Sequence, residues 1–347
     1  MRRTTPRPTG AMTRRPHLTR RALLGAPALI VPIRARAAAI RPAVIYDLGT
    51  KSDRSFNEGA FAGADRFRRE TGIGFVEFEP TNERQFEQAH RRFAERGYDP
   101  ILAVGVNQAE IAVKVARDFP STRFTLLDGV GHLPNVRSIL FREHEGAFLV
   151  GILAAMASRT GRVGFVGGMD IPLIRKFACG FAQGIKHADP RVQLVQNMTG
   201  TTPGAWNDPG RGVEIAKAQF AQGVDVVFAA AGATGLGVLR AARDAGKLAI
   251  GVDSNQNHLY PGTMLTSMVK DIDVAAYQAF ASARDGTWRP GVVELGLRDG
   301  AVGWSLDAHN AGLITPEMRR RTDEAKAAIV AGGVEVIDWT HTRSCPL

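Results

Sequence analysis

The chain has 347 residues, of which 44% are hydrophobic and 22% are charged, and its formal net charge is +10. This composition is typical of a globular protein, and the length favours two lobes over one. Residues 1–39 hold nine arginines and no acidic residue, and subtracting nine from +10 leaves about +1 for residues 40–347, which argues against a nucleic-acid-binding surface.

Residues 1–39 are typical of an export signal. The twin arginine Arg20–Arg21 precedes a mildly apolar run, Ala22–Ile33, and the Ala-Arg-Ala sequence at 35–37 suits a signal peptidase. A bilayer-spanning helix needs about 20 apolar residues, so this run is too short to span a membrane. Two arginines behind the run favour the twin-arginine route. We therefore expect a periplasmic protein without stable membrane insertion; a disordered basic tail is the alternative.

The first half of the body alternates short apolar runs with helical patterns. Strands are predicted at 43–48, 74–80, 101–106 and 124–129, and helices near 55–70, 82–96 and 107–118. A further strand at 135–141 leads into a predicted amphipathic helix, Glu143–Ser158. This alternation is typical of βαβ units and a parallel, doubly wound sheet.

The second half repeats the alternation. Strands are predicted at 162–168, 192–198, 225–232 and 248–253, with helices near 172–188, 211–222 and 235–245, and the remainder is predicted as a strand, a helix and a two-stranded ribbon in 290–306. The sequence thus predicts an α/β fold of two doubly wound parallel-sheet lobes, joined by several short crossings that act as a hinge. We assign 40–142 and 256–286 to lobe 1, and 143–255 and 287–347 to lobe 2.

Polar residues gather where the predicted strands end. Asp47, Asp128, Gly232 and Asp253 close four strands drawn from both lobes, and ligands of open parallel sheets bind at the carboxyl ends of the strands. A single aspartate is more often a helix cap or a turn former. Three of them at equivalent strand ends predict a binding site in one cleft.

Aromatic residues lie near the same strand ends. Phe56 and Asn57 begin a predicted helix, and Trp206 lies in a loop rich in glycine and proline. Two rings, one from each lobe, would hold a flat heterocycle, since stacking contributes about 1–3 kcal/mol per base. The alternative is an indole folded onto its own lobe. Lys270 would offset the repulsion among the aspartates, although a lone lysine is usually solvated.

The sequence offers little for catalysis or metal binding. Its two cysteines, Cys179 and Cys345, form no CxxC or Cys/His cluster, so a zinc site is not expected, and whether they pair remains open. Motifs such as GxSxG, HExxH and GxxxxGK[ST] are absent. Histidines such as His144, on a helix face, are expected at the surface. We expect no catalytic residue, no cofactor and no metal.

Several segments together resemble one family. The stretches DLGTKSDRSFNEGAFAGA, GGMDIPLIRKFACGF, FAAAGATGLGVLRAARDAG, IGVDSNQ and LTSMVKDIDVA are similar, in order and spacing, to the basic-membrane-protein (BMP) family. Its members are periplasmic or lipid-anchored substrate-binding components of ABC importers, and many bind purine nucleosides. The resemblance covers residues 43 to 285 and implies a type I periplasmic-binding-protein fold that works with an ABC permease and its ATPase.

The resemblance also implies roles for individual residues. A base would stack between Phe56 and Trp206, although the family typically has phenylalanine at the second position. The resemblance places base-edge contacts on Asn57 and Asp128, ribose contacts on Gly232, Asp253 and Lys270, and positions that line the same cleft on Asp47 and Phe177. The lipidation cysteine of the family is replaced by the twin-arginine leader, so a freely soluble periplasmic protein is expected.

The favoured interpretation is therefore a periplasmic binding protein for a purine nucleoside, without enzymatic activity. One alternative is the same fold with a free nucleobase, a flavin or another heterocycle as its ligand, which the indole at position 206 keeps open. Another is an exported nucleoside hydrolase, because paired carboxylates can act as acid and base. A sensory or regulatory binding protein is the third.

Overall fold

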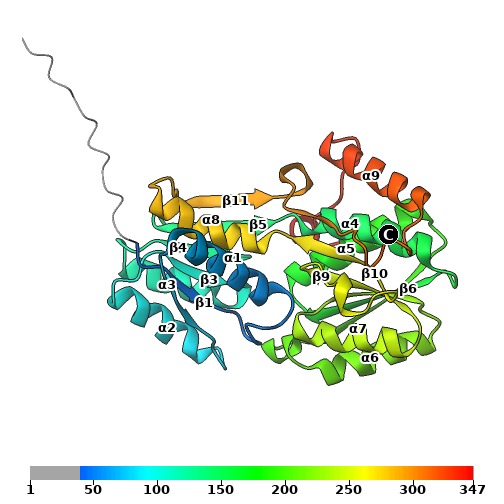
Figure 1. The fold of residues 1–347 in the computed structure, drawn as a ribbon, viewed down its shortest axis with the longest axis horizontal. Coiled ribbons are helices and arrows are strands. Elements are labelled where there is room, and N and C mark those ends of the chain that lie inside the picture. Colours follow the sequence, from blue (N-terminus) through cyan, green and yellow to red (C-terminus); the bar gives the residue numbers. More distant parts are fainter. Residues whose placement is uncertain (1–39, 347) are drawn as a thin grey trace, which may run out of the picture. The chain divides into compact units, whose positions relative to one another are not determined.

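The structure, a computed structural model, describes residues 40–346. The predicted export signal at 1–39 lies outside the described residues. The described residues form two α/β lobes, each built on one six-stranded sheet with helices on both faces (Figure 1).

Lobe 1 has an all-parallel sheet with the strand order β11-β5-β4-β3-β1-β2. Its strands are β1 (Ala43–Ile45), β2 (Val76–Phe78), β3 (Ile101–Val104), β4 (Phe124–Leu127), β5 (Val136–Phe141) and β11 (Gly291–Leu295). Its helices are α1 (Phe56–Thr71), α2 (Arg84–Glu95), α3 (Ala109–Asp118) and α8 (Ile272–Arg284).

Lobe 2 has the strand order β12-β10-β9-β8-β6-β7, with β12 antiparallel to β10 and the other pairs parallel. Its strands are β6 (Arg162–Met169), β7 (Gln193–Gly200), β8 (Val226–Ala230), β9 (Leu248–Asp253), β10 (Met264–Lys270) and β12 (Val302–Trp304). Its helices are α4 (Glu143–Ala157), α5 (Pro172–Ala188), α6 (Pro209–Ala221), α7 (Ala233–Asp244), α9 (Pro316–Val330) and α10 (Trp339–Thr342).

The central strands are continuous apolar runs because helices cover both faces of each sheet. Every residue of β3, β4 and β8 is buried, as expected for parallel strands. Helix α4 is buried nearly all round as well, so the prediction of an amphipathic helix there was wrong. Its backbone approaches α5 at glycines: a Cβ atom at Gly184 would lie 2.0 Å from the carbonyl oxygen of Phe148.

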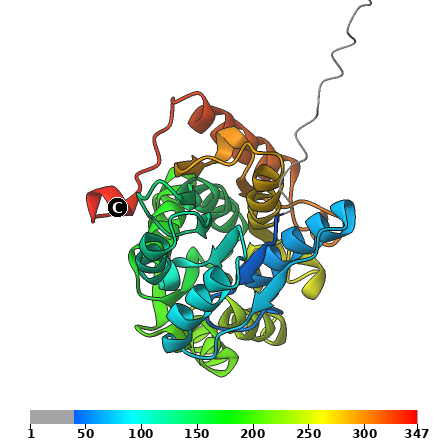
Figure 2. The ribbon, with the colours of Figure 1, turned by 90° about the vertical axis from the view of Figure 1, so that its left-hand side faces the viewer.

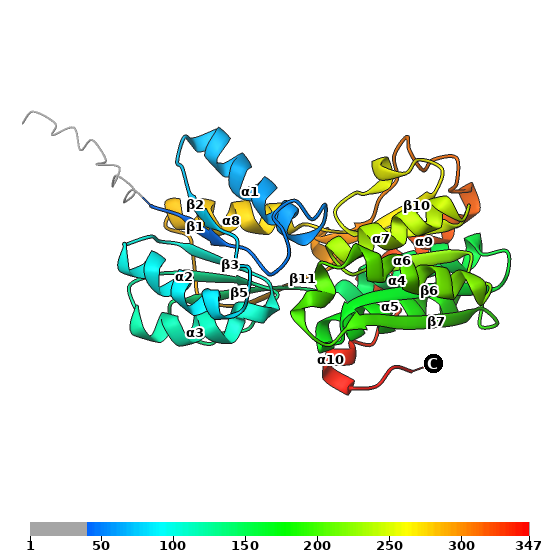
Figure 3. The ribbon, with the colours of Figure 1, turned by 90° about the horizontal axis from the view of Figure 1, so that it is seen from below.

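Three short crossings connect the lobes within residues 40–346, as the predicted hinge requires (Figure 3). They are Arg142 between β5 and α4, Asp271 between β10 and α8, and residues 296–301 between β11 and β12. Hydrogen bonds join them: the N–H of Arg142 donates to the carbonyl of Leu295 (2.8 Å), and the N–H of Asp271 donates to the carbonyl of Ala301 (2.9 Å). The crossings thus form one hinge.

The predicted lobe boundaries near the hinge were wrong for two strands. β10, within the 256–286 segment assigned to lobe 1, pairs with β9 in the sheet of lobe 2. β11, within the 287–347 segment assigned to lobe 2, pairs with β5 in the sheet of lobe 1. The predicted ribbon in 290–306 does not form, because β11 and β12 join different sheets.

The C-terminal segment, residues 337–346, returns to the outer side of α5, where the red chain descends from α9 in Figure 2. A disulfide joins Cys179 of α5 to Cys345, 166 residues further along the chain, which answers the question of pairing. Among residues 40–346 no helix is long and apolar enough to cross a membrane.

Candidate ligand-binding site

All nine residues predicted for the site line one cavity between the lobes. It encloses about 650 Å³ of space between its walls, the open mouth included. The predicted residues that line it are Asp47, Phe56, Asn57 and Asp128 from lobe 1, and Phe177, Trp206, Gly232, Asp253 and Lys270 from lobe 2. The folding of two sheets therefore brings together residues up to about 220 positions apart in the chain.

Two of the aspartates adopt an unusual backbone conformation at the strand ends. Asp128 follows β4 with φ 61°, and Asp253 ends β9 with φ 65°. Residues other than glycine rarely adopt positive φ, and such conformations persist where the surrounding structure fixes them, often at functional sites. Both residues line the cavity, each at the edge of its own sheet where the carboxyl ends of the parallel strands meet.

Asp47 and Asn57 build the loop between β1 and α1. The side-chain oxygen of Asn57 accepts a hydrogen bond from the N–H of Asp47 (3.0 Å), and its amide group donates to the carbonyls of Asp47 (3.4 Å) and Thr50 (3.3 Å). The Asp47 carboxylate accepts from the N–H of Leu48 (2.8 Å) and from Asn107 (2.9 Å). Asn57 is thus occupied by its own loop, and a contact with a base edge would have to replace these bonds.

Asp53 also lines the cavity, although the sequence analysis did not select it. Its carboxylate accepts hydrogen bonds from the N–H groups of Ser55 (2.8 Å), Asn57 (2.9 Å) and Glu58 (3.1 Å). It therefore caps the first turn of α1. The position of this aspartate in the sequence, just before a predicted helix, could have indicated its capping role. Burial raises the pKa of Asp53 to about 7, even though these hydrogen bonds lower it.

Lys270 is buried and links the two lobes. Its Nζ lies 2.5 Å from Oδ2 of Asp128 and 2.9 Å from Oε1 of Glu143. Burial alone would lower the pKa of Lys270, but Asp128, Glu143 and Asp253 together raise it above its usual value, so the side chain stays charged. Lys270 is therefore not a solvated lysine, and Glu143 is a buried partner that the sequence analysis missed.

Asp128 keeps one oxygen without a partner. Its Oδ1 is buried and accepts no hydrogen bond from any residue in 40–346. Burial raises the pKa of Asp128 to about 6, although the neighbouring Lys270 lowers it. A buried acceptor without a donor is costly, so a ligand N–H or O–H group at this point would stabilise the cleft.

The two lobes also touch beside Asp253. Its Oδ2 accepts a hydrogen bond from the hydroxyl of Ser55 in the opposite lobe. The carbonyl of Arg54 accepts from the hydroxyl of Ser254 (2.8 Å) and from the side-chain amide of Gln256 (2.8 Å). These bonds hold the cleft closed along this side. Burial raises the pKa of Asp253.

Aromatic rings line the cavity from both lobes. Phe56 of lobe 1 lies beside Lys270, with 4.9 Å between Nζ and the ring centroid. Trp206 of lobe 2 lies on two glycines: a Cβ atom at Gly168 would lie 2.2 Å from its Cζ3, and one at Gly232 would lie 3.8 Å from its Cε3. The indole therefore rests on its own lobe and also lines the cavity.

Comparison with known proteins places the chain in a family. Residues 40–331 match the family model described as ABC transporter substrate-binding protein, PnrA-like (Bmp). The chain belongs to this family. The BMP resemblance read from the sequence is thereby confirmed.

Individual relatives agree with the PnrA-like assignment. The chain is 35% identical to an uncharacterized lipoprotein of Pyrococcus horikoshii, over 77% of this chain and 69% of the relative. It is 28% identical to the ABC transporter nucleoside-binding protein BmpA of Lactococcus lactis, over 86% and 89% of the two chains. A solved ABC transporter solute-binding protein of Aeropyrum pernix superimposes with a TM-score of 0.80 at 30% identity, covering 86% and 93%.

As a PnrA-like ABC transporter substrate-binding protein, the chain binds a small ligand and works with a permease and an ATPase. The predicted fold of two periplasmic-binding-protein lobes is confirmed. The identity of the ligand and the roles of the nine lining residues stay predictions. Among the described residues, no group of three or more histidine, cysteine or acidic side chains is placed to hold a metal ion.

Proposed function

We propose that this protein binds a purine nucleoside in the cleft between its lobes and delivers it to an ABC permease. The observation that carries the proposal is the composition of the cavity wall, in which aromatic rings from both lobes stand beside four carboxylates and one lysine. Ligand pockets are mostly apolar and aromatic, with a few polar groups that fix the orientation of the ligand, so this wall suits a ligand that has both a flat ring and several hydrogen-bond donors.

The base would occupy the space between Phe56 and Trp206. Both side chains line the cavity, and they come from opposite lobes, so closure of the lobes would place a planar ring between them. The indole offers a stacking surface wide enough for a bicyclic base. Removal of this ring surface from water, with stacking, contributes about 1–3 kcal/mol per ring.

Asp128 would bind the edge of the base. Its partnerless buried Oδ1 accepts hydrogen bonds only, because Lys270 keeps the carboxylate largely ionised. A ring N–H next to a carbonyl, as in guanine and hypoxanthine, supplies the donor that this oxygen lacks. Adenine has no ring N–H at that edge, so we expect inosine and guanosine to bind more tightly than adenosine.

The ribose hydroxyls would meet Asp253 and Lys270, near the left-handed turn at Gly232. The wall carries four aspartates and only one lysine, which suits an uncharged ligand rich in hydroxyl groups. A phosphate group would be repelled by this excess of negative charge. The charge balance therefore favours a nucleoside over a nucleotide.

The alternative ligand class, a free nucleobase or another heterocycle, remains supported by Trp206, because stacking alone does not require a sugar. Binding without chemical change accounts for every group in the cleft, so we propose no enzymatic activity. A nucleoside hydrolase would release free hypoxanthine from inosine, and chromatography of the incubated mixture tests for that product.

We also propose that the protein is exported by the twin-arginine signal in residues 1–39 and acts in the periplasm. The disulfide between Cys179 and Cys345 supports an oxidising compartment, and relatives named lipoproteins support export. Fusing residues 1–39 to a reporter that requires the twin-arginine route tests the proposal: we expect export that stops when Arg20 and Arg21 are replaced by lysine.

Calorimetric titration of the ligand-free protein tests the proposed ligand. We expect inosine and guanosine to bind, hypoxanthine to bind more weakly because it lacks the ribose, and inosine monophosphate to bind weakly or not at all. Asp128→Asn should reduce the preference for inosine over adenosine, because an amide can also donate. If Asp128→Asn binds each of these nucleosides as tightly as the parent protein binds it, the assignment of Asp128 is refuted.

A further inference from the structure

A row of charged side chains, buried except for the half-buried Asp338, runs from the cleft to the C-terminal segment. We call it the charge chain; in order its members are Asp128, Lys270, Glu143, Lys176 and Asp338. Only the first two line the cavity. The other three lie behind the cleft, in α4, α5 and the C-terminal segment, and the binding of a ligand does not by itself require them.

Glu143 is the centre of the charge chain. It is the first residue of α4, directly after the hinge crossing at Arg142, and it is fully buried. Its Oε1 lies 2.9 Å from Nζ of Lys270, and its Oε2 lies 2.8 Å from Nζ of Lys176. Neither oxygen accepts a hydrogen bond of good angular geometry from residues 40–346, so these contacts are ion pairs whose balance depends on both ammonium groups.

Lys176 connects Glu143 to the C-terminal segment. Its Nζ donates to the carbonyl of Phe141 (2.8 Å) and lies 3.6 Å from Oδ2 of Asp338. Burial alone would lower the pKa of Lys176, but Glu143 and Asp338 raise it. His144 lies beside this pair, with Nδ1 3.6 Å from Asp338. It is buried, which corrects the expectation of a surface residue, and burial lowers its pKa to about 4, so it is neutral.

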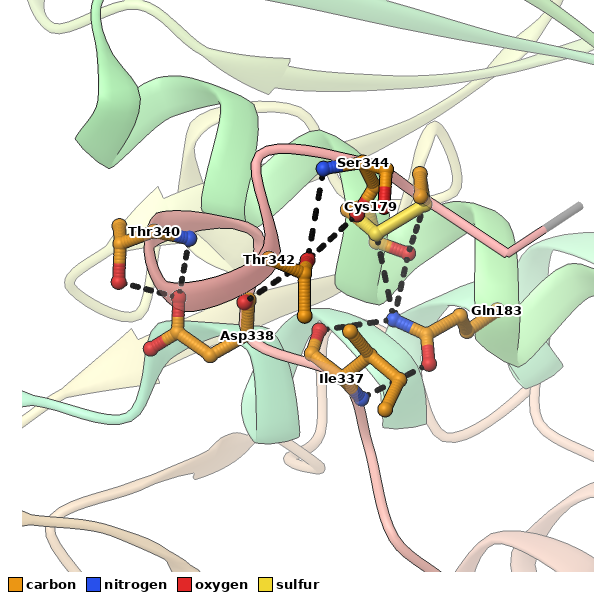
Figure 4. Close-up of a disulfide and its surroundings, with 8 residues drawn as sticks. Cys179, Gln183, Ile337, Asp338, Thr340, Thr342 and Ser344 are labelled. Carbon is orange, nitrogen blue, oxygen red and sulfur yellow. Dashed lines mark hydrogen bonds between the residues drawn. A yellow bond between two sulfur atoms is a disulfide. The ribbon is translucent and has the colours of Figure 1, made fainter.

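Asp338 is held on both sides by α5 (Figure 4). On one side, the side chain of Gln183 donates to the carbonyl of Ile337 (3.0 Å) and accepts from its N–H (2.9 Å). On the other side, the disulfide fixes Cys345 to Cys179. The carboxylate itself accepts two hydrogen bonds from Thr340. The segment therefore has little freedom to withdraw the charge of Asp338.

The geometry points to Asp338 as a positioning residue for the ligand-binding cleft. It acts through the charge chain, and the disulfide keeps it in place. Without the negative charge of Asp338, Lys176 pairs more strongly with Glu143, and Glu143 then holds Lys270 less firmly. Lys270 shifts towards Asp128, which reduces the capacity of that carboxylate to accept a bond from the ligand. Asp253 and Arg142 also lie near the charge chain, and no substitution below alters them.

Two substitutions test this inference because they should act in opposite directions. In the ligand-free protein, Asp338→Asn should lower the pKa of Asp128, measured by carboxyl-carbon NMR, because positive charge then predominates nearby. Lys176→Met should raise that pKa, because Lys270 is then drawn to Glu143. Asp189→Asn, which removes a surface ion pair with Arg191 at the end of α5, is the control and should change nothing.

Inosine affinity provides the second measurement, and only this one rests on the proposed function. Asp338→Asn should weaken inosine binding by about three- to tenfold. Removing the disulfide with Cys179→Ala and Cys345→Ala should weaken it in the same direction, and combining all three changes should add little, since both act through one carboxylate.

The outcomes separate the two claims. If the parent protein binds no nucleoside, the proposed function fails, while the pKa of Asp128 still tests the charge chain. The inference is overturned if Asp338→Asn leaves that pKa at the control value, or if the disulfide and Asp338 effects on affinity add fully. Should Lys176→Met fail to fold, the near-isosteric Asp338→Asn and the cysteine pair decide.

Discussion

Gly168 supports the indole of Trp206, and replacing it should disturb the cleft with little other damage. A Cβ atom at Gly168 would lie 2.2 Å from Cζ3, 2.5 Å from Cε3 and 3.0 Å from Cη2 of Trp206. Carbon atoms in contact are roughly 3.5 Å apart, so the ring must move by about 1.3 Å. Because Gly168 lies behind the ring, this movement narrows the cavity.

Gly168→Ala should therefore weaken inosine binding by about 5- to 150-fold, the equivalent of losing about 1–3 kcal/mol of stacking. Calorimetric titration measures the loss. Gly312→Ala is the matched control in the same lobe, because a Cβ atom there meets no atom within 4 Å, and its affinity should equal that of the parent.

A second substitution distinguishes a blocked cleft from general damage. A phenyl ring at position 206 does not extend as far as the six-membered ring of the indole, so adding Trp206→Phe to Gly168→Ala should restore part of the lost affinity. If Gly168→Ala binds inosine as tightly as the parent, the indole does not form a wall of the ligand site, and the reasoning is refuted.

Three further predictions concern charge and covalent linkage. Burial raises the pKa of Asp128 to about 6; its contribution to folding stability is therefore present below its unfolded pKa of about 4 and lost as pH rises through about 6. As pH falls from about 7.5 to 5, the thermal midpoint of the ligand-free parent should therefore rise relative to that of Asp128→Asn, whereas the affinity of the parent for inosine should fall. A difference between the two midpoints that does not change with pH would contradict this. Lys270→Met leaves Asp128 buried without a counter-ion and Glu143 paired with Lys176 alone, so it should lower the free energy of unfolding, measured in urea, by about 3–5 kcal/mol. A loss under about 1 kcal/mol would show that the ion pairs of Lys270 do not support the fold. Replacing Cys179 and Cys345 by alanine should lower the free energy of unfolding by about 2–5 kcal/mol. An unchanged thermal midpoint would argue against the disulfide in solution.

The sequence predicted the α/β architecture because apolar runs and helical patterns alternate clearly. It did not predict the strand exchange at the hinge. Alternation gives the order of elements along the chain, whereas the pairing of β10 with β9 and of β11 with β5 depends on contacts between distant segments. Strand-end aspartates could be found because the carboxyl ends of parallel strands meet at one edge of each sheet.

The residues behind the cleft gave no such signal. Glu143 is an acidic residue in the first turn of a helix, where negative charge is common, and only tertiary packing shows that it bridges two lysines. His144 is buried because α5 packs along α4 and Asp338 of the C-terminal segment lies beside it, and the helical pattern reveals neither neighbour. The pairing of Cys179 with Cys345 likewise depends on the return of the C-terminal segment to α5.

The central claim is that a purine base lies between Phe56 and Trp206, with Asp128 at its edge. The crystal structure of the protein with bound inosine tests it most directly. We expect the hypoxanthine ring between the two side chains, with its N–H within hydrogen-bond distance of the Asp128 carboxylate and the ribose beside Asp253 and Lys270. A base bound outside this space, or an indole that touches only its own lobe, would contradict the account.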